Sequence, residues 1–147
     1  MRRLAQGLVI VCCVTMGLMS QAFAAENISK ITDVELMTIL KEEGYVPAIE
    51  KPSVISVKME SLKVIFFVAD NHESIQAYAG FSDRKVTLAC INEWNKTKRY
   101  SRAYVDNEGD PVIELDLDLV GGVSKERIID FIKTTRVTLP AFAAHIL

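Results

Sequence analysis

The chain has 147 residues, of which 50% are hydrophobic and 24% are charged, and its formal net charge is −2. This balance is typical of one globular domain with a single core. No basic patch rich in aromatic residues offsets the acidic balance, which argues against nucleic acid as a partner.

The first 24 residues have the layout of a cleavable secretory signal peptide. Two arginines precede an uncharged run from Leu4 to Met19, and small residues at Ala22 and Ala24 suit a signal peptidase. A membrane anchor is the alternative, but the run is short for a spanning helix. A lipoprotein signal is disfavoured because no small residue precedes either cysteine of the run. We therefore expect cleavage after Ala24 and a periplasmic or secreted protein without a stable membrane anchor.

Removal of residues 1–24 leaves residues 25–147 as a single domain and changes two counts. Loss of the two arginines takes the formal net charge from −2 to −4. Cys12 and Cys13 leave as well, so Cys90 is the only remaining thiol and no intramolecular disulfide can form. The apolar neighbours of Cys90 favour a buried position, with pairing between chains as the alternative.

The first predicted helix covers residues 32 to 43. Thr32 and Glu35 form a capping box, and Gly44 supplies the stop. Between them runs an apolar stripe at helical spacing, made of Val34, Leu36, Met37 and Leu40.

Three strands are predicted next. VISVKM (54–59) alternates, with Ile55, Val57 and Met59 on one face. KVIFFVAD (63–70) is apolar on both faces, which is typical of a central strand. ESIQAYAGFS (73–82) alternates again, and DNHE (70–73) is expected to be a hairpin turn.

The second half of the chain predicts a helix, a hairpin and a final helix. Apolar residues from Val86 to Trp94 recur at helical spacing, so a helix is expected from residue 86 or 87 to 96. NEGD (107–110) is the turn of an antiparallel hairpin. Two glycines end the hairpin, Ser124 caps the last helix, and Pro140 is expected to kink it. The apolar positions of that helix are Ile128, Ile129, Phe131, Ile132, Val137, Leu139, Phe142 and Ile146.

Alternation in the second hairpin strand places Glu114, Asp116 and Asp118 on one face, opposite four inward leucine and isoleucine side chains. Acids spaced by two residues lie nearly 7 Å apart, about twice the rise of 3.3 Å per residue, so one metal ion cannot be surrounded by such a row. We interpret the row as a solvated face and expect no metal. Nothing in the sequence marks one acid as buried and another as exposed, which argues against an acid–base pair.

Four side chains between the middle helix and the following strand are candidate partner-binding residues: Trp94, Tyr100, Arg102 and Tyr104. Aromatic and arginine side chains dominate the contact energy of protein interfaces. The structural alternative is that Arg102 and Tyr104 share a face with Glu114 and Asp116 and pair with these acids across the hairpin. Trp94 is more often a core residue than a contact.

The stretch INEWNKTKRYSRAYVDNEGDPVIELDLDLVGGVS (91–124) resembles the signature region of YbjN-domain proteins, a bacterial family labelled as sensory transduction regulators. In this family a helix that ends in Trp-Asn precedes an RAY strand and a GDP turn. The likeness extends through SIQAYAGF, ITDVELMTILKEEGY and the final helix. It implies an α+β fold similar to type III secretion chaperones, an antiparallel sheet with helices at the N-terminus, middle and C-terminus. It also implies binding of protein segments and dimer formation, and it transfers no catalytic residues.

Two functions of different class remain open. The first is an exported, noncatalytic module that binds an unidentified protein or peptide, as a monomer or a homodimer, and needs no cofactor. The second is a periplasmic enzyme of the hydrolase class. The chain has no glycine-rich phosphate loop, no metal-spaced His or Cys cluster and no G-x-S-x-G elbow. We therefore predict a protein that is not an enzyme.

Overall fold

A six-stranded antiparallel sheet with the order β1-β2-β3-β4-β6-β5 forms the centre of the molecule. The computed structural model describes residues 27–82 and 84–147, so the predicted signal peptide lies outside the described residues. The elements are α1 (Asp33–Glu42), β1 (Ala48–Lys51), β2 (Val54–Met59), β3 (Leu62–Val68), β4 (Ser74–Gly80), α2 (Leu88–Thr97), β5 (Arg102–Val105), β6 (Pro111–Asp118) and α3 (Lys125–His145). The predicted α+β class is confirmed. Among the described helices, none is long and apolar enough to cross a membrane.

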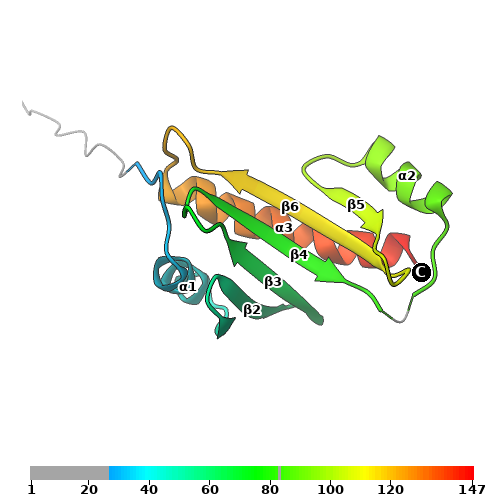
Figure 1. Ribbon diagram of the computed structural model, residues 1–147, viewed down its shortest axis with the longest axis horizontal. Helices are drawn as coiled ribbons and strands as arrows, with labels where there is room; N and C mark the ends of the chain where they lie inside the picture. The colour runs from blue at the N-terminus through cyan, green and yellow to red at the C-terminus, as the bar shows by residue number, and fades with distance from the viewer. Residues whose placement is uncertain (1–26, 83) are drawn as a thin grey trace, which may run out of the picture.

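All three helices contribute to one core on a single face of the sheet. The long helix α3 runs behind β4 and β6, α1 contacts β2, and α2 contacts β5 and α3 (Figure 1). Strand register explains the core, because inward positions face each other on neighbouring strands. These buried positions are Ile55, Val57, Met59, Val64, Phe66, Val68, Ile75, Ala77, Ala79, Ala103, Ile113, Leu115 and Leu117. The inward faces predicted for residues 54–59 and 111–119 are therefore confirmed.

The capping signals of the sequence fix the helix starts. Glu35 N donates to Thr32 Oγ1 at 3.3 Å, and Thr32 N donates to Glu35 Oε2 at 2.7 Å, which is the predicted capping box. After α1, Gly44 has φ +87°, a conformation that glycine adopts without strain. Ser124 caps α3 as predicted, since its side chain accepts from Arg127 N.

Four positions of the predicted apolar stripes are wrong, because they are exposed: Val34, Leu88, Ala89 and Val137. Leu88 is 71% exposed, because α2 packs only against the four-residue strand β5 and α3 and buries little beyond Ile91 and Trp94. Val137 is also 71% exposed. Two residues along a helix is a rotation of about 200°, so Val137 points away from the face that buries Thr135. The helix continues through Pro140 as one element.

Cys90 is half-buried between α2 and α3. Its Sγ lies 3.7 Å from His145 O, and His145 Nε2 lies 2.9 Å from Cys90 O. The predicted burial of this thiol is therefore correct in part. These reciprocal contacts join the end of α3 to the first turns of α2.

Candidate binding face on the open side of the sheet

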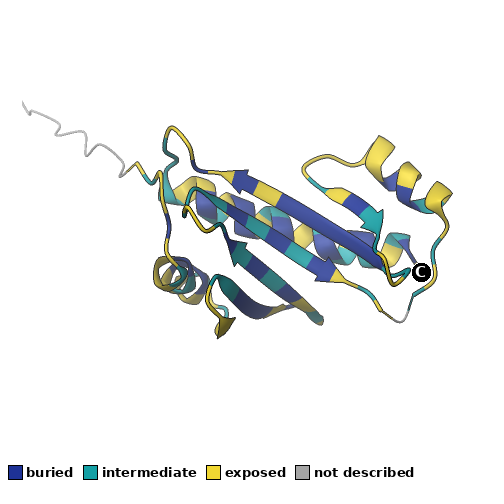
Figure 2. Cartoon of the chain, viewed as in Figure 1, coloured by how far each residue is buried: buried dark blue, intermediate teal, exposed yellow. Residues whose placement is uncertain are grey.

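The sheet face opposite α3 carries no helix within the described ranges, and it is the side seen in Figures 1 and 2. Much of this face is half-buried rather than exposed, which Figure 2 shows as teal segments along β3 and β4. We call it the open face. Register places on it Ser56, Lys63, Ile65, Phe67, Gln76, Tyr78, Arg102, Tyr104, Val112, Glu114 and Asp116.

Glu114 lies at the centre of a polar cluster on the open face. Tyr104 OH donates to Glu114 Oε1 at 2.7 Å, and Arg102 Nη2 donates to Glu114 Oε2. The Arg102 guanidinium carbon also lies 5.8 Å from the Tyr104 ring centroid. The cross-strand pairing of Arg102 with an acid, predicted as the structural alternative, is thus present. Arg102 and Tyr104 together give the buried carboxylate of Glu114 two hydrogen-bond donors.

The titratable groups around Glu114 keep their protons. Burial, followed by the hydrogen bond to Glu114, raises the pKa of Tyr104 to about 12. Burial also raises the pKa of Tyr78. The hydrogen bond to Glu114 raises the pKa of Arg102. Near neutral pH the two phenols and the guanidinium are therefore hydrogen-bond donors, and none of the three is available as a general base.

An aromatic region adjoins this cluster on β3 and β4. The rings of Phe67 and Tyr78 meet edge to face at 5.9 Å between centroids. Beside them Gln76 Nε2 donates to Asp116 Oδ1 at 2.9 Å. Aromatic rings, an arginine and satisfied polar groups thus share one face of the sheet, a composition that is typical of protein interfaces.

The acid row of β6 is not uniform. Asp116 and Asp118 are exposed as predicted, but Glu114 is buried. The difference follows from position: Glu114 lies between Arg102 on β5 and Tyr78 on β4, whereas Asp116 and Asp118 lie beyond the end of β5. The sequence did not reveal which acid β5 would cover.

The structure does not bring the four candidate partner-binding residues together. Trp94 is 1% exposed, packs 5.1 Å from Phe142 between ring centroids, and donates from Nε1 to Ser101 Oγ at 3.1 Å. It is a core residue. Tyr100 is 76% exposed, while Arg102 and Tyr104 share the open face. Sequence reasoning missed Phe67 and Tyr78, although the two-sided apolarity of residues 63–70 was a signal that β3 also has an apolar outer face.

Three acids gather at the β5–β6 turn. Ligand atoms of Asp106, Glu108 and Asp110 lie within 4.8 Å of one another. Turn geometry accounts for this arrangement, because Asp106 Oδ1 accepts from the backbone N–H groups of Glu108 and Asp110, each at 2.9 Å. The three acids are therefore gathered by the backbone hydrogen bonds of the turn.

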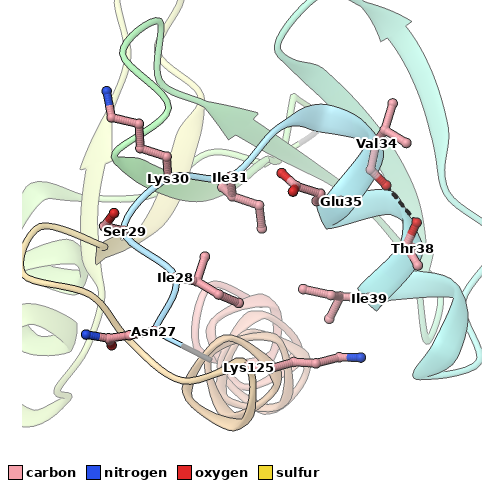
Figure 3. Close-up of a pocket in the computed structure, with 10 residues that line it drawn as sticks. All are labelled: Asn27, Ile28, Ser29, Lys30, Ile31, Val34, Glu35, Thr38, Ile39 and Lys125. Carbon is pink, nitrogen blue, oxygen red and sulfur yellow. Dashed lines mark hydrogen bonds between the residues drawn. The ribbon is translucent and has the colours of Figure 1, made fainter. Parts of the chain in front are cut away.

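A cavity of about 470 Å³ lies between the segment that precedes α1, α1 itself and the start of α3. Figure 3 shows Ile28, Ile31 and Ile39 directed toward its middle. Glu35 on its wall is used by the capping box, and Lys30 forms an ion pair with Glu73 at 3.4 Å. The cavity is an apolar hollow whose charged wall residues have structural roles.

Both histidines contact backbone carbonyl groups. His72 Nδ1 lies 3.1 Å from Ile31 O, and His145 Nε2 lies 2.9 Å from Cys90 O. These contacts give His72 and His145 structural roles at the first hairpin turn and at the α2–α3 contact.

Comparison with known proteins finds one matching family and similar solved structures. The YbjN family model, described as "Putative bacterial sensory transduction regulator", matches residues 32–147. The crystal structure of YbjN, a putative transcription regulator from E. coli, is similar with a TM-score of 0.63 and 17% identity, over 83% of this chain and 98% of that chain. A Methanothermobacter thermautotrophicus protein described as uncharacterized gives a TM-score of 0.48 and 12% identity, over 78% and 96% of the two chains. The curated proteins contain no match. At 17% identity the E. coli structure supports the fold alone.

Proposed function

The chain belongs to the YbjN family, and from this membership we propose that it is an exported, noncatalytic regulatory module that binds a segment of another protein. The regulatory part of the proposal follows the description of the family. Export rests on the signal-peptide layout of residues 1–24. Protein binding rests on the open face.

The observation that carries the binding proposal is the composition of the open face. Phe67 and Tyr78 present aromatic surface that α3 and the other helices leave uncovered. Arg102 lies on the same face, with Glu114 between it and Tyr78, and its position is fixed by Glu114. Fixed aromatic and arginine side chains lose little conformational entropy when they bind, which favours them as interface anchors. The family resemblance implies a fold similar to type III secretion chaperones and binding of protein segments, and this expectation is in line with the same function.

Substitution on the open face tests this function. We would express the full chain with a C-terminal affinity tag, purify it from periplasm and compare three forms: the wild type, Phe67→Glu, and the matched control Val137→Glu. Val137 lies on the outer side of α3 and is well exposed. A stoichiometric polypeptide is expected with the wild type and the control and is expected to be lost with Phe67→Glu.

Thermal melts of the three chains would show that each is folded. Absence of a stoichiometric polypeptide from the wild type, or its retention by folded Phe67→Glu, would contradict binding at the open face. The exported hydrolase gains no support from the structure, because the contacts of both histidines are structural.

A further inference from the structure

Strand β5 covers only half of β6. Their pairing runs from Val105 opposite Pro111 to Arg102 opposite Glu114, whereas β6 continues to Asp118. Two residues before β5 begins, Tyr100 has φ +64°, an uncommon conformation for a non-glycine residue. The chain therefore leaves the sheet at this point, and the second half of β6 has β4 on one side and no strand on the other in the described ranges.

The unpaired half of β6 directs backbone groups outward. Pro111 O accepts from Phe81 N, and Leu119 N donates to Glu73 O, so odd-numbered residues of this strand direct their backbone groups toward β4. Even-numbered residues point the other way, because backbone direction alternates along an antiparallel strand. The backbone of Glu114 faces β5, where this residue pairs with Arg102. The backbone groups of Asp116 and Asp118 face the side without a strand. Such an edge is a template for another strand.

A cavity of about 450 Å³ lies beside this edge, between β6 and α3. Leu115 and Phe131 give its walls an apolar part. The rest of the lining is Tyr100, Asp116, Thr134 and the Arg127–Asp130 ion pair of α3. A strand added to β6 would direct every second side chain to the α3 side of the sheet, which is the side of these walls. The cavity could therefore receive an apolar side chain from the added strand.

The acidic side chains at this edge favour a basic strand as the one that is added. Asp116 and Asp118 lie in one row with Glu114 on the open face, and β5 already places Arg102 opposite the first acid of this row. Opposite charges at facing positions stabilise a strand pair, and like charges destabilise it. A strand that continues the row therefore favours lysine or arginine opposite both aspartates. The same rule disfavours self-pairing of two copies through this edge, because it would bring their aspartates together.

We propose that the edge formed by residues 115–118 binds an extended segment of a partner protein, in which basic residues alternate with apolar ones. The basic side chains face Asp116 and Asp118, and an apolar side chain between them enters the cavity beside Phe131. This inference rests on the proposed function and adds to it: the partner that contacts the aromatic region of the open face makes a second, separate contact at the edge, through a segment of stated chemistry. Binding of this kind is β-strand addition.

The test uses synthetic peptides and amide chemical shifts of the mature chain, residues 25–147. The probe is an alternating lysine–valine octapeptide, and the control replaces each lysine by glutamate. We expect the lysine peptide to shift amides of residues 114–118 and of the adjoining part of α3. The glutamate peptide is expected to bind at least about tenfold more weakly, a difference that salt should reduce.

Two matched variants separate edge from face. Asp116→Pro removes an outward N–H, a change that edge strands tolerate, and it should weaken the lysine peptide about tenfold or more. Phe67→Glu should leave peptide binding unchanged. A lysine peptide that is N-methylated at the residues facing Asp116 and Asp118 should bind the wild-type protein weakly. Its affinity should be as low as that of the unmodified lysine peptide for Asp116→Pro. Because the N-methylated peptide is measured on the wild-type protein, its result does not depend on whether Asp116→Pro folds normally.

The proposal is overturned if the lysine peptide gives no shifts at about 1 mM, or if Asp116→Pro and N-methylation leave its affinity unchanged. A dimer of the free protein that dissociates on Asp116→Pro would assign the edge to a second copy and would also overturn it. If a co-purified polypeptide is lost with Phe67→Glu but retained with Asp116→Pro, the proposed function stands and the edge assignment fails.

Discussion

Arg102 donates a hydrogen bond to Glu114 directly across the β5–β6 pairing, although the Arg102 side chain is 65% exposed and that of Glu114 is 8% exposed. The pair therefore links a solvent-exposed guanidinium group to a buried carboxylate. Loss of the arginine leaves this carboxylate with Tyr104 as its remaining donor in the cluster, and a buried charge that loses a partner is costly.

Arg102→Met is expected to lower the free energy of unfolding by about 1 kcal/mol, since the exposed side of the pair moderates the cost. The control is Arg136→Met, because the pair of Arg136 with Glu60 is exposed on both sides. Its loss is expected to cost less than the loss of Arg102, because an ion pair that is exposed on both sides contributes little to stability. Urea unfolding near neutral pH measures the loss of unfolding free energy in both variants. Equal losses would contradict the view that the burial of Glu114 makes its pair with Arg102 more important than an exposed pair.

Tyr104→Phe is expected to change how stability depends on pH. The pKa of Tyr104 is raised from 10.0 to about 12, so the folded chain holds the phenol proton more tightly than the unfolded chain. The stability from this difference is fully present below pH 10 and is lost as pH rises through 12. The wild type should therefore exceed Tyr104→Phe in stability by more at about pH 8 than at about pH 11. Urea unfolding at both values checks this, and a constant difference would contradict it.

Local chemistry made much of the fold predictable. The capping box at Thr32, the glycine stop at Gly44 and the alternation of β6 depend on neighbours within a few residues, and the structure has them where the sequence placed them. Burial of Glu114 was not predictable, because it depends on where β5 ends. Trp94 is in the core, the position that the sequence favoured, but its contact with Phe142 at the far end of α3 was not predictable from its neighbours in the chain.

The register of β6 is testable by two substitutions on adjacent residues. Leu117→Asp places a charge without a partner in the core, which should cost several kcal/mol or prevent folding. Asp116→Ala removes an exposed side chain and the hydrogen bond from Gln76, so a change of only about 0.5 kcal/mol is expected. Thermal melts with the opposite order would mean that the strand register is shifted by one residue.

Cys90 should react slowly with a thiol reagent in the native protein and rapidly after unfolding, because its thiol is half-buried against the end of α3. His145→Ala removes the ring that contacts Cys90 O, so it should speed native labelling. Kinetics with a chromogenic disulfide reagent measure both rates. Native labelling as fast as in denaturant, or a disulfide-linked dimer on a nonreducing gel, would show that the thiol is accessible.

Export is tested through residues 1–30 fused to a reporter that becomes active only in the periplasm. Activity is expected there, and N-terminal sequencing of the full-length protein after expression should read from Ala25, because Ala22 and Ala24 provide the small residues before the cut. Val9→Arg places a charge in the uncharged run and should abolish reporter activity, whereas Gln6→Ser near the start of the run should preserve it. An uncleaved chain that fractionates with the membrane would instead identify residues 4–19 as an anchor.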